Sequence, residues 1–181
     1  KKLIEFASDG YCYKAFRKFL DNLKDNPNKD SAEQLYFFLE ANHFPITADG
    51  CFLAYKSVKR QHGDCLVDHY SGKFDNSVGK TVKMDRKTCD SDRTVTCSRG
   101  LHVAAFQYAH EFRGDSTIIE VKVNPKDVVS VPNDYNNQKM RVCEYYVVKK
   151  GQSEIKQSYL SQKYIAGKVK FKNIPGIDET M

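Results

Sequence analysis

The segment that decides the fold is Thr47-Ala48-Asp49-Gly50-Cys51-Phe52-Leu53-Ala54-Tyr55-Lys56-Ser57-Val58. Its first four residues are typical of a turn, because Asp and Gly readily take turn conformations. The following eight residues are mostly apolar and aromatic, a pattern that favours a β-strand. Residues before this segment have helical periodicity and residues after it divide into short strands, so the segment separates an α part from a β part.

Two helices are predicted before the turn. Between residues 11 and 23 the apolar side chains recur at helical spacing and form one stripe; they are Ala15, Phe16, Phe19, Leu20 and Leu23. Pro27 ends this pattern, since a proline disfavours helix at the residue before it. A second helix begins near Asp30 or Ser31, either of which can cap it, with Glu33 or Gln34 placed for a reciprocal bond; this helix ends at residues 41–43.

The chain after the turn is predicted to be mostly strands. Strands are expected at residues 79–84, 100–103, 117–123, 128–131 and 141–148, with a helix at 104–112. The polar residues 59–76 form a long loop or a weak hairpin, and 85–96 form a second polar loop. Long loops in a compact domain usually bind something. The predicted fold is α+β: a helix pair packed on a twisted, mainly antiparallel sheet, with one further helix after the Gly-Leu-His-Val strand.

Length and composition indicate one hydrophobic core. With 181 residues of which 40% are hydrophobic, we predict a single domain at residues 1–150, with helices at about 11–43 and the sheet at about 50–148. Residues 151–181 are predicted to be a C-terminal tail with room for one short helix. The first residue is Lys rather than Met, which favours a fragment of a longer protein.

Charge and cysteine content restrict the class of protein. The formal net charge is +6, but the basic residues are scattered among acidic ones, which argues against a nucleic-acid partner. A nucleic-acid contact by the basic tail, whose densest stretch is Lys163, Lys168, Lys170 and Lys172, is kept as a weaker alternative to a solvated face. No apolar run reaches the roughly 18 residues of a transmembrane helix, and the N-terminus lacks the apolar segment of a secretory signal. The six cysteines lack tight pairing, so we expect reduced thiols and a cytoplasmic protein.

The most distinctive passage is Cys97-Ser98-Arg99-Gly100-Leu101-His102-Val103-Ala104, in which a glycine precedes a short strand that leads directly into a helix. Arg99 and the helix N-terminus could hold an anion at this corner. His102 faces away from Leu101 and Val103 in strand geometry, so it could point into a cleft. The alternative is that His102 is an ordinary half-buried histidine and Gly100 a bend.

Other chemistry is weakly supported. His62, Cys65 and His69 form a single loose half of a zinc site without a matching pair, so no metal is expected. A phosphate-binding loop and a serine nucleophile elbow are both absent from the sequence, and no cofactor is expected. The acidic residues of 85–92 are read as a solvated loop. Tyr135, beside Asp134 in the 132–137 loop, is a reasonable contact residue.

Several longer motifs resemble one known family. They are Ile46-Thr47-x-Asp49-Gly50-x-Phe52-x-Ala54-Tyr55-Lys56, Asp75-Asn76-Ser77-x-Gly79-Lys80-x-Val82-Lys83-Met84, Thr96 to Val103, Val121-Lys122-Val123-x-Pro125-x-Asp127-Val128-Val129-Ser130, Asp134-Tyr135-Asn136, and Lys139-Met140-Arg141. Across residues 16–148 the chain resembles the C-terminal part of the tailed-phage rIIB rapid-lysis proteins. The family's N-terminal helix-turn-helix-like region has no counterpart here, which places any DNA-related role in doubt.

The resemblance implies an early phage protein that acts with a partner, rIIA. Together they protect infection from a prophage-encoded exclusion system that depolarises the membrane, and they influence lysis timing. The expected location is the host cytoplasm, with peripheral attachment to the inner membrane through a partner as an open alternative. The expected partner is an rIIA-like protein or a host defence component, and a small anionic ligand is a further alternative.

We therefore expect a non-enzymatic binding module, since the resemblance carries no catalytic residues. The residues expected to bind a ligand or partner are Tyr55, Lys56, Asp75, Asn76, Ser98, Arg99, His102, Asp134, Tyr135 and Arg141. Five of them, Lys56, Asp75, Arg99, His102 and Arg141, are predicted to line one concave pocket.

A fainter similarity to ADP-ribosyltransferase folds keeps an NAD- or nucleotide-acting enzyme open as the alternative function. Its candidate residues are Tyr55, His102, Tyr108 and Glu144. The chain departs from that pattern because it has no clear Ser-Thr-Ser motif and no placed catalytic Glu. The fold can be related to these enzymes without the activity being present.

Overall fold

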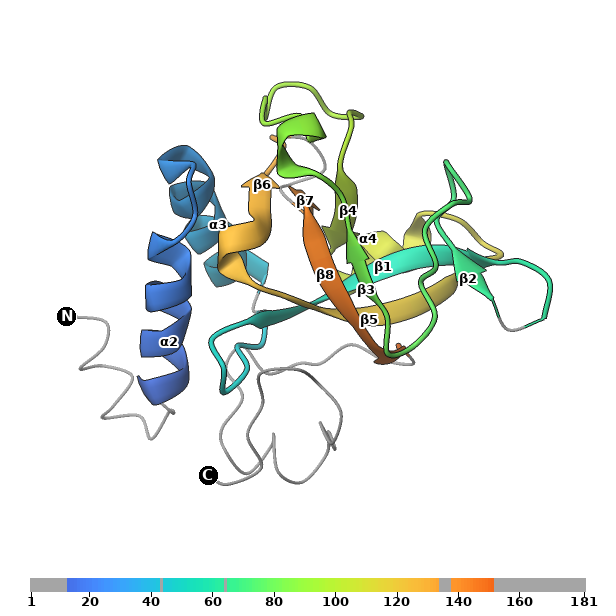
Figure 1. The fold of residues 1–181 in the computed structure, drawn as a ribbon, viewed down its shortest axis with the longest axis horizontal. Helices are drawn as coiled ribbons and strands as arrows, with labels where there is room; N and C mark the ends of the chain where they lie inside the picture. Colours follow the sequence, from blue (N-terminus) through green and yellow to red (C-terminus); the bar gives the residue numbers. More distant parts are fainter. Residues whose placement is uncertain (1–12, 43, 64, 134–137, 152–181) are drawn as a thin grey trace.

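The computed structural model describes residues 13–42, 44–63, 65–133 and 138–151, and these residues form an α+β domain (Figure 1). The helices are α2 (Tyr13–Lys24), α3 (Lys29–Asn42) and α4 (Phe106–Glu111), with short 3-10 helices η1 (Arg86–Thr88) and η2 (Pro125–Asp127). The strands are β1 (Phe52–Arg60), β2 (Leu66–Val67), β3 (Thr81–Lys83), β4 (Leu101–Ala104), β5 (Thr117–Val123), β6 (Val128–Ser130), β7 (Lys139–Val142) and β8 (Glu144–Lys150). The predicted fold class is confirmed.

The strands form one antiparallel sheet in the order β3-β8-β5-β1-β4-β7-β6, with β2 paired to β1. β1 pairs with β5 along most of its length, from Phe52↔Val123 to Val58↔Thr117. On its other side β1 meets β4 at one residue pair, Tyr55↔Ala104. The sheet therefore consists of two well-paired parts, β3-β8-β5-β1 and β4-β7-β6, that are joined over a short contact.

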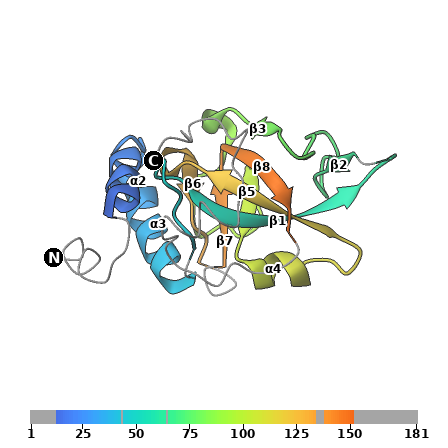
Figure 2. The same cartoon turned by 90° about the horizontal axis from the view of Figure 1, so that it is seen from below.

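The helix pair packs against one end of this sheet, where α3 lies beside β6 (Figures 1 and 2). α2 contacts η2 at the same end. α2 buries Ala15, Phe16 and Phe19, three members of its predicted apolar stripe. The cap predicted for α3 is wrong. Asn28 caps this helix, because its Oδ1 accepts hydrogen bonds from the backbone N–H groups of residues 30 and 31 at 3.0 and 3.3 Å.

Ser31 and Gln34, expected in the capping bonds, instead attach α3 to the sheet. The Ser31 hydroxyl donates to the backbone carbonyl of Val129, and Gln34 Oε1 accepts from the backbone N–H of Val131 at 3.1 Å. These bonds satisfy backbone groups of the strand end that the ladder leaves unpaired. The polar residues at the start of α3 thus fix the helix pair to the sheet.

The turn at residues 47–50 is held by α2. Asn22 Nδ2 donates to the carbonyls of Asp49 and Gly50 at 3.0 and 3.1 Å. Gly50 has φ +76°, and a Cβ at this position would lie 2.4 Å from the backbone carbon of Lys18. Only glycine therefore allows this close approach between turn and helix. The Asp49 carboxylate also makes a buried ion pair with Lys122 on β5 at 2.7 Å, which fixes the start of β1.

Long-range pairing changes two of the predicted elements. The strand expected at 141–148 is two strands separated at Cys143: β7 pairs with β4 and β6, whereas β8 pairs with β5 and β3. The helix expected from Ala104 begins two residues later, since Ala104 pairs with Tyr55 and Lys139 in the sheet. Of the two alternatives expected for residues 59–76, the hairpin is confirmed: β1 pairs with β2 at Lys59↔Val67. The tail helix expected after residue 151 lies outside the described residues.

Candidate functional site

A pocket of about 370 Å³ opens where β1 and β4 separate beyond their single paired position. We call it the wedge pocket. Its lining comes from β1, the 68–74 loop, residues 97–100, β4 and α4, which lies alongside β1 in Figure 2. The residues of this lining are Tyr55, Lys56, Ser57, Asp68, His69, Tyr70, Ser71, Phe74, Met84, Cys97, Ser98, Arg99, Gly100, Leu101, His102, Val103, Ala104, Tyr108, Ala109, Phe112 and Lys139.

The structure brings half of the sequence-predicted site residues together. Those that line the wedge pocket are Tyr55, Lys56, Ser98, Arg99 and His102. Asp75, Asn76 and Arg141 lie outside the lining, so the predicted set of five does not converge as a whole. Asp134 and Tyr135 fall outside the described residues. Because segments far apart in the sequence supply the lining, the sheet rather than local sequence creates the pocket.

Lys56 is a half-buried amine in this lining. Its Nζ donates a hydrogen bond of 2.8 Å to the backbone carbonyl of His102, and it lies 5.8 Å from the centre of the Tyr145 ring. The side chain therefore connects β1 to β4 beyond Tyr55↔Ala104, the one position at which these two strands pair. Burial lowers the pKa of Lys56 from 10.5 to about 8, against an opposing effect of the Asp68 carboxylate. A substantial fraction of this amine is thus neutral in mildly alkaline solution.

Two neutral histidines accompany Lys56. Burial, followed by the charges of Lys56 and Lys139, lowers the pKa of His102 to about 3. Burial, followed by the charges of Arg113 and Lys56, also lowers the pKa of His69. Both imidazoles are therefore uncharged near pH 7, when each ring has one N–H donor and one acceptor nitrogen.

His69 enters the lining through contacts that sequence reasoning missed, because that reasoning weighed it only as a zinc ligand. Its Nε2 lies 3.0 Å from the Ser57 hydroxyl and 3.2 Å from the Ser116 hydroxyl. Its ring lies 5.8 Å from that of Phe112, which follows α4. The 68–74 loop is thereby held against β1 and α4. No sequence signal predicts this arrangement, since β1 and α4 meet only in the folded chain.

Asp68 is the one acidic residue among the described lining residues, and its own loop surrounds it. It accepts hydrogen bonds from the backbone N–H groups of Ser71 at 2.6 Å, Gly72 at 3.3 Å and Phe74 at 3.1 Å, and from the Ser71 hydroxyl at 2.8 Å. Burial alone would raise the pKa of Asp68, but these bonds outweigh it and the pKa is lowered. The carboxylate is therefore ionised and committed to shaping the loop.

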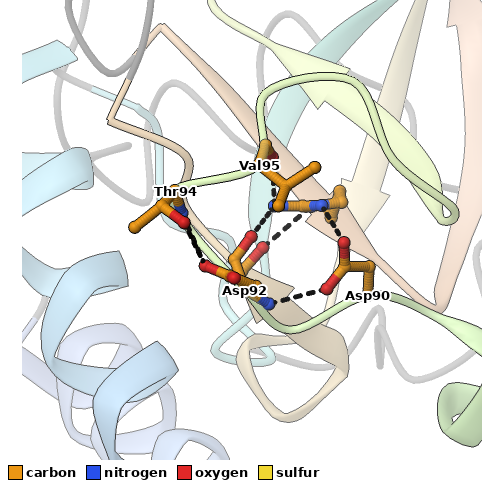
Figure 3. A network of polar contacts seen from close by, with 6 residues as sticks. Asp90, Asp92, Thr94 and Val95 are labelled. Carbon is orange, nitrogen blue, oxygen red and sulfur yellow. Dashed lines mark hydrogen bonds and ion pairs between the residues drawn. The ribbon is translucent and has the colours of Figure 1, made fainter.

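Arg141 is fully buried next to the pocket and anchors the 90–99 loop. Its Nε donates to the Ser130 hydroxyl at 2.9 Å, and its Nη2 donates to the carbonyls of Asp92 and Val95, the latter at 2.9 Å. Its Nη1 forms an ion pair with Asp90 at 3.4 Å. Figure 3 shows Asp90, Asp92, Thr94 and Val95 gathered in this network. Arg141 thus positions the loop that carries Ser98 and Arg99 to the pocket.

Gly100 connects this anchored loop to β4. It has φ +153°, and a Cβ there would lie 3.3 Å from Arg141 Cγ. A glycine at this position lets the backbone pass directly over the buried arginine. The corner recognised in the sequence is therefore a tight approach between β4 and β7, with Ser98 and Arg99 on its pocket side.

Asn76 and Asp75 each contact other residues of the chain and do not line the wedge pocket. Asn76 is buried, accepts a hydrogen bond from the Tyr145 hydroxyl and donates to the carbonyl of Phe74 at 2.9 Å. Asp75 is half exposed and pairs with Lys80 at 3.8 Å. Asn76 therefore ties the segment before β3 to β8 and supports the lining residue Phe74 without itself lining the pocket.

In the part of the chain that the structure describes, no three His, Cys, Asp or Glu side chains converge as a metal site requires. Among the same residues, no helix has the length and apolar character needed to cross a bilayer.

The candidates for the ADP-ribosyltransferase alternative separate in space. Tyr55, His102 and Tyr108 line the wedge pocket. Glu144 lies instead on β8 and pairs with Lys83 on β3 at 2.9 Å. The carboxylate expected to complete such a site is thus directed to another part of the sheet.

Together these features define an α+β domain with a basic, partly apolar pocket in a divided antiparallel sheet. The chain belongs to the family described as Bacteriophage T4 protein rIIB, which matches residues 1–156. It is 45% identical over 149 residues to Protein rIIB of Enterobacteria phage T4, covering 81% of this chain and 46% of that protein. The chain thus spans about half the length of this curated relative, and the resemblance seen in the sequence motifs is confirmed. No solved structure matches the chain.

Proposed function

We propose that this chain is a binding domain of a phage rIIB-family protein that counters host or prophage exclusion and affects lysis timing with an rIIA-like partner. The observation that supports this most is the wedge pocket, to which separate loops contribute polar side chains without an ordered catalytic set. In this proposal the protein acts in the host cytoplasm, either free or held at the inner membrane by its partner.

The binding residues in this proposal fall into two groups. Tyr55, Lys56, Ser98, Arg99 and His102 provide the contact surface of the pocket. Asp75, Asn76 and Arg141 hold the surrounding segments in place, as their contacts with other parts of the chain suggest. Asp134 and Tyr135 remain proposed contacts.

Charge reversal at Arg99 tests this proposal, because Arg99 is exposed at the pocket edge and its change should leave the fold intact. The phage protein that carries this domain would be co-expressed with its rIIA partner, and co-purification and plating on an excluding host would be measured. We expect Arg99→Glu to reduce both at least tenfold. Lys87→Glu, an equal charge reversal on exposed η1 outside the pocket, should reduce neither. Equal behaviour of the two variants would contradict the assignment of the pocket.

A second candidate function, action on NAD, is favoured by the lining residues Tyr55, His102 and Tyr108. It is opposed by the position of Glu144 and by the hydrogen bonds that occupy Asp68. Incubation of the folded protein with NAD, followed by measurement of free nicotinamide, separates the candidates. A binding domain gives no release above buffer, whereas catalytic release that Tyr55→Ala removes would establish the enzyme.

A further inference from the structure

We propose that the wedge pocket binds a small planar ring bearing a phosphate group, with the phosphate contacting Lys56. This inference rests on the proposed function as a binding domain and adds the chemical class of the ligand. A nucleoside monophosphate has both parts in one molecule and serves as the probe.

The size and walls of the pocket fit the ring. A volume of about 370 Å³ lies at the small end of the roughly 300–1,000 Å³ range of small-molecule sites. One wall is aromatic: the ring centre of Phe112 lies 6.0 Å from that of Tyr108 and 5.8 Å from that of His69. Leu101 and Val103 add aliphatic surface from β4. Flat aromatic rings are favourable packing partners for such walls.

The charges of the lining fit an anion. Three basic side chains line the pocket, Lys56, Arg99 and Lys139, against the single carboxylate of Asp68. That carboxylate already accepts hydrogen bonds from Ser71 and Phe74 within its own loop. The pocket therefore has an excess of positive charge in partly apolar surroundings, where electrostatic attraction is stronger than in water.

Lys56 is the member of this set best placed for the phosphate. In the described part of the chain its ammonium forms no ion pair, and its single hydrogen bond goes to the carbonyl of His102. An ammonium has three donors, so others are available for a ligand oxygen. Its charge lowers the pKa values of both His69 and His102, which indicates that Lys56 lies near residues from both sides of the wedge.

The charges that face Lys56 predict how binding depends on pH. Asp68 stays ionised, His69 and His102 stay neutral and Tyr145 stays protonated between pH 7 and 9. The phosphate is a dianion throughout, because its second pKa is about 6. Lys56 loses its proton in this range. Affinity should therefore fall as pH rises through about 8.

The test uses AMP, adenosine and ribose 5-phosphate with the whole 181-residue chain, by calorimetry and by chemical-shift titration. We expect AMP to bind at least tenfold more tightly than either adenosine or ribose 5-phosphate. The backbone shifts should map to residues 55–57, 68–74 and 98–104. Lys56→Met should reduce AMP affinity at least tenfold and leave adenosine unchanged. Lys59→Met removes an exposed lysine from the same strand, outside the lining, and should leave AMP binding unchanged.

Each contrary result overturns a separate part of the inference. If adenosine binds as tightly as AMP, the proposed contact with the phosphate is wrong. If ribose 5-phosphate binds as tightly as AMP, the proposed contact with the ring is wrong. If Lys56→Met fails to fold, the pH dependence of the unchanged protein decides the role of Lys56, since constant affinity from pH 7 to 9 contradicts it. Absence of binding by all three probes would reject this ligand class, while the Arg99→Glu co-purification result tests the binding domain independently.

Discussion

Replacing Arg141 with methionine tests whether one buried guanidinium holds the loop that forms the pocket edge. Methionine keeps much of the aliphatic volume but removes every donor. In the folded protein this guanidinium reaches the Ser130 hydroxyl, the carbonyls of Asp92 and Val95, and the carboxylate of Asp90. All but the first of these partners lie in the 90–99 loop, so the loop should separate from β7 in the variant.

The expected loss of stability can be worked out from these contacts. Hydrogen bonds to a charged group contribute about 1.5–3 kcal/mol each. The Asp90 carboxylate is partly exposed and stays solvated when Arg141 is removed, so the ion pair itself adds only about 0–1 kcal/mol. The loop carbonyls of Asp92 and Val95 belong to exposed residues and can bind water once the loop moves. We therefore expect a loss of about 3 kcal/mol for Arg141→Met, mainly because the buried Ser130 hydroxyl loses its charged partner.

Urea unfolding of the purified variants measures this loss. Arg141→Lys keeps the charge but lacks the planar fork of donors, so it should restore less than half of the lost stability. Lys80→Met breaks an exposed pair and should cost less than about 1 kcal/mol. Hydrogen exchange in residues 90–99 should accelerate in Arg141→Met but not in Lys80→Met. A loss below about 1 kcal/mol with unchanged exchange in the loop would refute the anchoring role.

Three further predictions concern single residues. Asn76→Ala should lose about 1–3 kcal/mol, because it leaves the buried Tyr145 hydroxyl without its partner, and thermal unfolding would show this as a lower Tm. Gly100→Ala should lose about 1–3 kcal/mol from backbone strain, whereas Gly114→Ala, with open space around it, should be near neutral in the same assay. Lys56 should contribute stability that rises between about pH 8 and 10.5, because the unfolded chain binds more protons at this position than the folded chain does; the difference in unfolding free energy between the wild type and Lys56→Met should show this rise.

Local patterns predicted the elements that local chemistry determines. The apolar stripe of α2 and the β-branched run at Thr117–Val123 were placed correctly, since each pattern follows the periodicity of its own element. The bend at Cys143 was missed because its cause is nonlocal. Its backbone N–H donates to the carbonyl of Asp127 and its carbonyl accepts from Met84, so two distant segments divide the strand.

The site was partly predictable for a similar reason. The motif around Ser98 and Arg99 indicated a sharp corner with polar groups, and the structure has such a corner at Gly100. Sequence reasoning could not separate Arg141 from the pocket residues, because a buried structural arginine and a ligand-binding arginine have the same sequence signal. His69 joins the lining only after the β1–β2 hairpin folds against α4.

The titration of the Lys56 side-chain amine, followed by nitrogen NMR with and without AMP, tests the central claim most directly. Because Lys56 is half buried in the wedge between β1 and β4, its pKa should be about 8 in the free protein. Saturating AMP should raise this pKa, since a bound phosphate stabilises the ammonium. A value near the ordinary 10.5 that AMP leaves unchanged would contradict both the burial of this amine and its contact with the ligand.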